Sequence, residues 1–121
     1  MDTHLAFESE PSYLRVIIRG EYPSKSRRDV LSAIHAKMTE LSYTRVFADC
    51  RELDAPKTEM DRFNLGVAIA EMVADRYRIA VVSKPEQISR FMENAAVNRG
   101  ARLVVMSDEK AAIAWLVEQE A

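Results

Sequence analysis

A chain of 121 residues has the usual length of one domain, and 48% hydrophobic with 30% charged residues is the balance of a globular protein rather than a disordered one. We therefore predict a single domain over residues 1–121. The 17 basic and 19 acidic residues are spread along the whole length and give a formal net charge of -2, which argues against nucleic acid as a partner.

Hydrophobic alternation predicts two strands at the beginning of the chain, over residues 5–8 and 13–19. The short connection between them fits an antiparallel hairpin. A helix is expected from about residue 26 to residue 41, with Ser26 as its N-cap. Its apolar side is formed by Leu31, Ile34, Met38 and Leu41.

The middle of the chain predicts a third strand over residues 45–49 and a second helix over residues 59–74. Thr58 stands before this helix, with Asp61 in the capping-box position three residues later. A short and nearly all-apolar strand follows over residues 79–83.

The third helix is predicted over residues 85–99, because apolar residues recur there at helical spacing and Gly100 is a natural C-terminal cap. Residues 103–106 form the last predicted strand. Ser107, Asp108 and Glu109 then open a final helix with a cap and two carboxylates near the positive end of its dipole.

This order of elements predicts an α/β fold with a five-stranded, mainly parallel sheet and four helices. Apolar strands separated by helices indicate parallel pairing, with the first strand as an antiparallel edge. The expected architecture is a β-α superhelix.

Four segments resemble the SpoIIAA-like proteins, the group that contains STAS domains and short bacterial STAS/SEC14-type domains. They are residues 46–53, which end a strand before the second helix, and residues 78–82, 96–100 and 112–116. The resemblance spans nearly the whole chain and implies a SpoIIAA-like fold. It also implies a module without catalysis that binds a protein partner or an apolar ligand.

The anti-sigma-factor antagonists of this group carry a phosphorylatable serine in an Asp-Ser-Ser-Gly-like turn before the second helix. This chain departs from that pattern, because residues 54–59 read Asp-Ala-Pro-Lys-Thr-Glu. Thr58 is therefore the one residue there that could take the place of the serine. The other interpretation of Thr58 is a helix cap.

Residue types that support catalysis or metal binding do not recur at useful spacings. His4 and His35 are far apart in the sequence and have no visible companion, and the single Cys50 adds no metal-ligand pattern. Three glycines also cannot form a dinucleotide-binding or Walker phosphate loop. We predict no enzyme activity, no metal site and no cofactor.

Polar side chains should gather at the carboxyl ends of the parallel strands, where open α/β sheets bind ligands. Asp49 and Arg51 are the candidates for such a contact, although Asp49 could instead pair with Arg51. Ser83 and Ser107 are most simply helix caps. Cys50 fits a buried small hydrophobe better than a reactive thiol.

The second helix carries an unusually wide apolar arc. One side holds Phe63, Val67, Ala70 and Ala74, and the arc continues through Leu65, Ile69 and Met72. We predict that the last three form a contact surface, either of a homodimer or of a ligand cleft. The alternative is that neighbouring helices cover them, and Met92 and Trp115 are expected in the core in any case.

The sequence thus favours a regulatory or interaction module that binds a protein partner or a second copy of itself. A carrier or sensor of a small apolar, lipid-like ligand is the alternative, and an enzyme comes third. One cysteine, a start without signal-peptide character and no apolar run near the roughly 20 residues of a membrane span predict a cytoplasmic protein.

Overall fold

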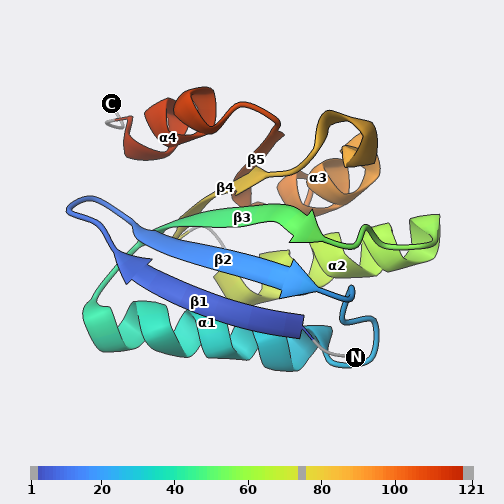
Figure 1. Cartoon of the computed structure of the whole chain (residues 1–121), viewed down its shortest axis with the longest axis horizontal. Helices are drawn as coiled ribbons and strands as arrows, with labels where there is room; N and C mark the ends of the chain where they lie inside the picture. Colours follow the sequence, from blue (N-terminus) through green and yellow to red (C-terminus); the bar gives the residue numbers. More distant parts are fainter. Residues whose placement is uncertain (1–2, 74–75, 119–121) are drawn as a thin grey trace.

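The computed structural model describes residues 3–73 and 76–118. Figure 1 shows strands and helices alternating along most of the chain after an initial hairpin. Their order is β1 (Thr3–Ser9), β2 (Leu14–Gly20), α1 (Arg27–Leu41), β3 (Arg45–Leu53), α2 (Glu59–Val73), β4 (Arg78–Val82), the 3-10 helix η1 (Pro85–Gln87), α3 (Arg90–Val97), β5 (Arg102–Met106) and α4 (Glu109–Val117).

The five strands form one sheet in the order β1-β2-β3-β4-β5. β1 pairs antiparallel with β2, and every later neighbour pairs in parallel. The predicted α/β class, the mainly parallel sheet and the antiparallel N-terminal edge strand are confirmed. No helix of the described residues is both long and apolar enough to cross a membrane.

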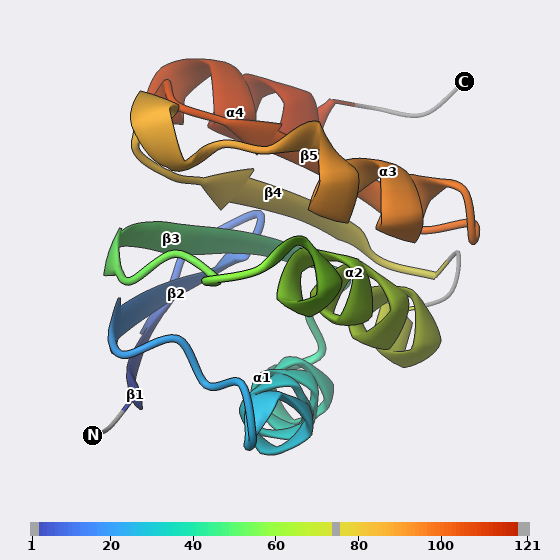
Figure 2. The ribbon, with the colours of Figure 1, turned by 90° about the vertical axis from the view of Figure 1, so that its right-hand side faces the viewer.

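The helices divide unequally between the two faces of the sheet, with α1, α2 and α3 on one side and α4 on the other (Figure 2). Side chains alternate along each strand, and β3, β4 and β5 contribute to both layers in this way. The larger core cluster includes Val16, Val46, Val81 and Val105 from the strands. The smaller one joins Phe47, Ala80 and Val82 to Ala112 and Leu116 of α4.

An irregularity in β3 breaks this alternation near its carboxyl end. Ile17 pairs with Asp49, but Arg19 pairs with Glu52, so β3 has two residues where β2 has one. Such a bulge lets two consecutive side chains point the same way. Glu52 therefore reaches Arg19 at 3.3 Å on the α4 side, and Leu53 turns back toward the larger core.

The predicted third helix is wrong at its beginning. Residues 85–87 form η1, Ile88 and Ser89 are extended, and α3 begins at Arg90. The interruption has a local cause, since the Ser89 hydroxyl accepts the backbone N–H of Phe91 at 3.2 Å and caps a new helix there. The helix also ends at Val97, before Gly100.

Several helix caps and one apolar position that the sequence predicted also differ from the structure. Ser26 and Asp108 occupy N-cap positions without a side-chain hydrogen bond. Ser83 and Ser107 are not caps, because Lys84 and Asp108 take those positions. Leu41, expected on the apolar side of α1, is 40% exposed at the end of that helix. Ala74, the predicted end of the second helix, lies outside the described residues.

Candidate functional site

A cavity lies inside the layer formed by α1, α2 and the sheet. It measures about 90 Å³, and among residues 3–73 and 76–118 no polar atom contributes to its exposed wall. Its wall is formed by Ile18, Tyr22, Pro23, Arg27, Val30, Leu31, Ile34, Val46, Ala48, Cys50, Leu53, Leu65, Ile69, Met72, Ile79, Val81 and Met92. We call it the inner cavity.

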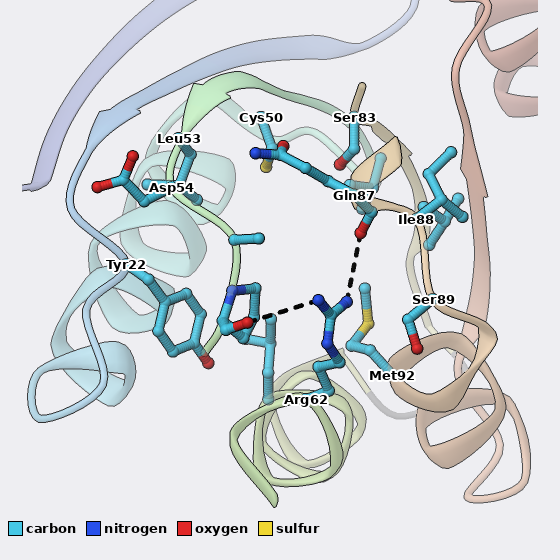
Figure 3. A pocket seen from close by; sticks show the side chains of 15 residues that line it. Tyr22, Cys50, Leu53, Asp54, Arg62, Ser83, Gln87, Ile88, Ser89 and Met92 are labelled. Atoms are coloured by element: carbon cyan, nitrogen blue, oxygen red, sulfur yellow. Dashed lines mark hydrogen bonds between the residues drawn. The ribbon is translucent and has the colours of Figure 1, made fainter. Parts of the chain in front are cut away.

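A second hollow of about 70 Å³ adjoins it at the carboxyl ends of β3 and β4, and we call this the mouth (Figure 3). The two hollows share six wall residues, so the mouth leads toward the inner cavity. The shared residues are Tyr22, Cys50, Leu53, Leu65, Val81 and Met92. Most of the polar side chains in the two walls are at the mouth, where Asp54, Arg62, Ser83, Gln87 and Ser89 are found, whereas Arg27 lies in the wall of the inner cavity.

The guanidinium of Arg62 lies across the mouth (Figure 3). Its Nη1 donates to the carbonyl oxygen of Gln87 at 3.3 Å, and its Nη2 donates to that of Pro56 at 3.5 Å. Nε lies 3.4 Å from a carboxylate oxygen of Glu59, a side chain that is 70% exposed. Arg62 thus connects the loop before α2 with η1.

Leu65, Ile69 and Met72 do not form the outer contact surface that the wide arc of α2 predicted. Ile69 is buried in the core, and Leu65 and Met72 are half-buried against it. The arc is wide because α2 lies between α1 and α3 and must also face the sheet (Figure 2). All three side chains instead line the inner cavity.

Asp49 and Arg51 lie on the opposite face of the sheet, away from the cavity. Arg51 donates through Nε to Asp49 Oδ1 at 2.9 Å and through Nη2 to Oδ2 at 2.8 Å. Its Nη2 also contacts Glu109 at 2.8 Å, and Arg15 contacts the other oxygen of Glu109 at 3.1 Å. Asp49 therefore pairs with Arg51 within a network that fastens the beginning of α4 to the sheet.

The electrostatics of this network fix its charges. Hydrogen bonds from Arg51 lower the pKa of Asp49, although burial opposes them, and the same hydrogen bonds raise the pKa of Arg51. Burial alone would raise the pKa of Glu109. The hydrogen bonds from Arg15 and Arg51 together outweigh this effect and leave the pKa below its ordinary value. All these groups stay ionised near neutral pH.

Cys50 lies between Asp49 and Arg51 in sequence but points to the cavity face. Burial raises the pKa of its thiol to about 12, and the nearby charge of Asp49 acts in the same direction. The thiol is therefore protonated at neutral pH and forms part of the apolar wall, although Cys50 is half-buried and not fully buried as predicted. A nucleophilic cysteine needs the opposite shift.

Thr58 lies just before α2 and is exposed. Its hydroxyl oxygen accepts the backbone N–H of Asp61 at 3.0 Å, which is the predicted helix-cap geometry. Pro56, two residues earlier, lines the mouth. Thr58 therefore stands next to the candidate site without contributing to its wall.

Sequence analysis did not single out Arg62, which together with Asp54 supplies the charged side chains of the mouth. A signal was present, because Arg62, Leu65, Ile69 and Met72 recur at intervals of three, four and three residues along one side of α2. A charged residue at the beginning of an otherwise apolar stripe marks the place where the buried face reaches water. Within residues 3–73 and 76–118, no three His, Cys, Asp or Glu side chains gather as a metal-ligand set.

The solved structures that are similar to this fold include two that match over nearly the whole chain. An anti-sigma factor antagonist from Mycobacterium paratuberculosis matches with a TM-score of 0.68 and 12% identity, over 97% of this chain and 96% of that one. An uncharacterized DUF3478-family protein with a SpoIIAA-like fold from Shewanella loihica matches with a TM-score of 0.57 and 16% identity, over 94% and 93%. The chain therefore has the SpoIIAA-like fold, as the sequence predicted.

No protein-family model matches the sequence, and no curated protein is significantly similar to it.

Proposed function

We propose that this chain is a cytoplasmic, non-catalytic regulatory module that binds a small apolar ligand in its core and a protein partner on its surface. The observation that carries the first part is the inner cavity of about 90 Å³ with its apolar wall. The fold that the chain shares with an anti-sigma factor antagonist supports the second part.

A partly enclosed apolar hollow of this kind favours an apolar occupant for a physical reason. Atoms around an empty space lose the dispersion contacts that a close-packed interior provides. An apolar molecule would restore those contacts without requiring hydrogen bonds from the wall. Ligand sites are usually concave and mainly apolar with a few polar groups, and the cavity and its mouth together have this composition.

The state of the titratable groups supports binding rather than catalysis. The thiol of Cys50 is protonated, and Asp49 and Glu109 are already engaged by arginines on the other face of the sheet. General acid-base or nucleophilic chemistry requires groups with pKa values shifted toward neutrality at the site.

Native mass spectrometry of the purified full chain tests the ligand. We expect a population whose mass exceeds that of the polypeptide and returns to it after denaturation. The apolar compound released on denaturation can then be identified by its mass. A native mass equal to that of the bare chain, in protein purified without detergent, would contradict ligand binding.

Self-association is a second candidate function, and an exposed apolar patch favours it. Met60 on α2 is 64% exposed and Phe91 on α3 is 42% exposed. The rings of Phe63 and Phe91 are 6.0 Å apart between centroids, so the patch crosses from one helix to the other. Covering such a patch with a second copy in a two-fold dimer would remove it from water.

Sedimentation velocity tests the dimer. The wild type should sediment as a dimer, and Phe91→Glu should shift it to a monomer with an unchanged circular dichroism spectrum. Val97→Glu is the matched control, because Val97 is 45% exposed on the same helix and, at about 100° per residue, points to a different side from Phe91. A monomeric wild type at all concentrations contradicts self-association and leaves a different protein as the partner.

A further inference from the structure

We propose that Arg62 recognises the polar end of the ligand, and that the ligand is a small amphipathic monocarboxylate whose apolar part enters the inner cavity. This inference rests on the proposed ligand-binding function. It names the chemical class of the ligand and assigns a specificity-determining residue.

The order of the two hollows sets the direction in which such a ligand lies. The inner cavity has no polar atom in its exposed wall, so a charged group there would lose its hydration without a partner. Arg62 lines the mouth but not the inner cavity. A charged end must therefore stay at the mouth while the apolar end passes Leu65 and Met92, which line both hollows.

The present contacts of Arg62 are weak enough to be exchanged. Its distances of 3.3 Å to Gln87 and 3.5 Å to Pro56 lie beyond the usual 2.7–3.2 Å for N–H···O bonds, and both acceptors are neutral carbonyls. A carboxylate could accept two parallel, charge-assisted hydrogen bonds from the same fork. Its ion-pair partner at 3.4 Å, Glu59, is 70% exposed, so water screens the charge of that carboxylate and the pair holds Arg62 only weakly.

Other charges near the hollows do not reverse this preference. Arg27 lies in the wall of the inner cavity, but its Nη1 donates to Ser24 at 2.8 Å and lies 3.9 Å from Asp61. Asp54 lines the mouth with an exposed side chain, so solvent screens its repulsion of an anion. The Arg62 side chain is only 18% exposed, and its attraction is screened less.

The volumes limit the apolar part to a short chain. The inner cavity measures about 90 Å³ and the mouth about 70 Å³. Taken together, the two hollows are comparable in volume with an engineered apolar cavity of roughly 150 Å³ that binds benzene. Hexanoate therefore serves as the probe, with 1-hexanol as a neutral molecule of the same chain length.

Isothermal titration calorimetry at pH 7 with both probes tests the proposal on the full chain. We expect the wild type to bind hexanoate at least tenfold more tightly than 1-hexanol. Arg62→Gln should weaken hexanoate to the level of 1-hexanol and leave 1-hexanol unchanged, and Arg62→Lys should keep part of the preference. Arg99→Gln is the matched control, since Arg99 packs over Phe63 and lines neither hollow.

The outcomes separate this inference from the function on which it rests. Equal affinities of the wild type for the two probes would overturn the role of Arg62 while leaving an apolar ligand in place, and this comparison needs no variant to fold. A preference that survives in a folded Arg62→Gln protein would also overturn it. Binding of neither probe would overturn both the inference and the ligand-binding function.

Discussion

The carboxylate of Glu93 on α3 accepts a hydrogen bond from the backbone N–H of Val105 on β5, at 3.1 Å from Oε2. Nη1 of Arg90 donates to the carbonyl oxygen of Val105 at 2.9 Å and to Oε1 of Glu93 at 2.6 Å. β5 is an edge strand, so these backbone groups would otherwise be open to another strand. Two side chains of α3 thus close one edge of the sheet.

The first prediction concerns this edge. Glu93→Ala should lower the free energy of unfolding by about 1–3 kcal/mol, because it leaves the Val105 N–H without its charged acceptor. Glu93→Gln should lose less stability, since the amide oxygen can still accept a hydrogen bond from the Val105 N–H. Urea unfolding measures both, with Glu86→Ala on the exposed η1 as the control. Equal stability of Glu93→Ala and wild type would show that water replaces the bond at no cost.

The fold could be predicted from the sequence because its signals are local. β4 is buried at every position, and a continuous apolar run bounded by helices predicts a central parallel strand. The same local signal failed at residues 85–89, where helical spacing continues through Ile88 although residues 85–87 form a 3-10 turn and Ile88 and Ser89 are extended. Periodicity shows which face is buried but does not locate the residue at which a helix begins.

The candidate site could be predicted only in part, because it depends on contacts between distant residues. Alternation explains why Asp49 and Arg51 share a face and pair, and that alternative was visible in the sequence. The bulge in β3, which turns Leu53 into the cavity wall, leaves no signal in composition or spacing. The position of Leu65 between sheet and neighbouring helices likewise required the packed structure.

The second prediction concerns pH. The folded-state pKa of Asp49 lies below its ordinary value because Arg51 hydrogen-bonds its ionised form. Its contribution to stability is therefore complete above the unfolded pKa, near 4, and is lost as the pH falls through the folded pKa. The stability difference between wild type and Asp49→Asn should be largest near pH 7 and shrink below about pH 4.

Chemical denaturation at a series of pH values measures this difference. Asp54→Asn, at an exposed position directly after β3, is the control for the removal of a carboxylate. A stability difference for Asp49→Asn that does not change between pH 7 and pH 3 would show that the carboxylate contributes nothing as an ion.

The third prediction assigns Thr58 mainly to helix capping. Thr58→Ala should cost about 1 kcal/mol of stability because the N–H of Asp61 loses its acceptor, whereas Thr58→Ser should keep the bond. Partner and ligand binding should be unchanged in both variants. Recovery of protein phosphorylated at Thr58 from cells, together with loss of a partner in Thr58→Glu, would favour a phosphorylation switch instead.

The last prediction concerns Gly66, where α2 packs closely against α3. A Cβ atom at this position would lie 2.5 Å from the carbonyl oxygen of Met92 and 2.8 Å from the Cβ of Ala95. The first of these is backbone, so relief requires the two helices to move apart. Alanine has the better helix propensity by about 1 kcal/mol, yet steric overlap in a packed core typically costs about 1–3 kcal/mol.

Gly66→Ala should therefore be less stable than wild type in urea unfolding, although helix propensity alone would make it more stable. Ser32→Ala, on the exposed side of α1, is the control and should be neutral or slightly stabilising. Because Leu65 and Met92 line both hollows, separation of α2 from α3 should also widen the mouth and weaken hexanoate binding. A Gly66→Ala protein as stable as Ser32→Ala, with unchanged binding, would show that the helix contact yields without cost.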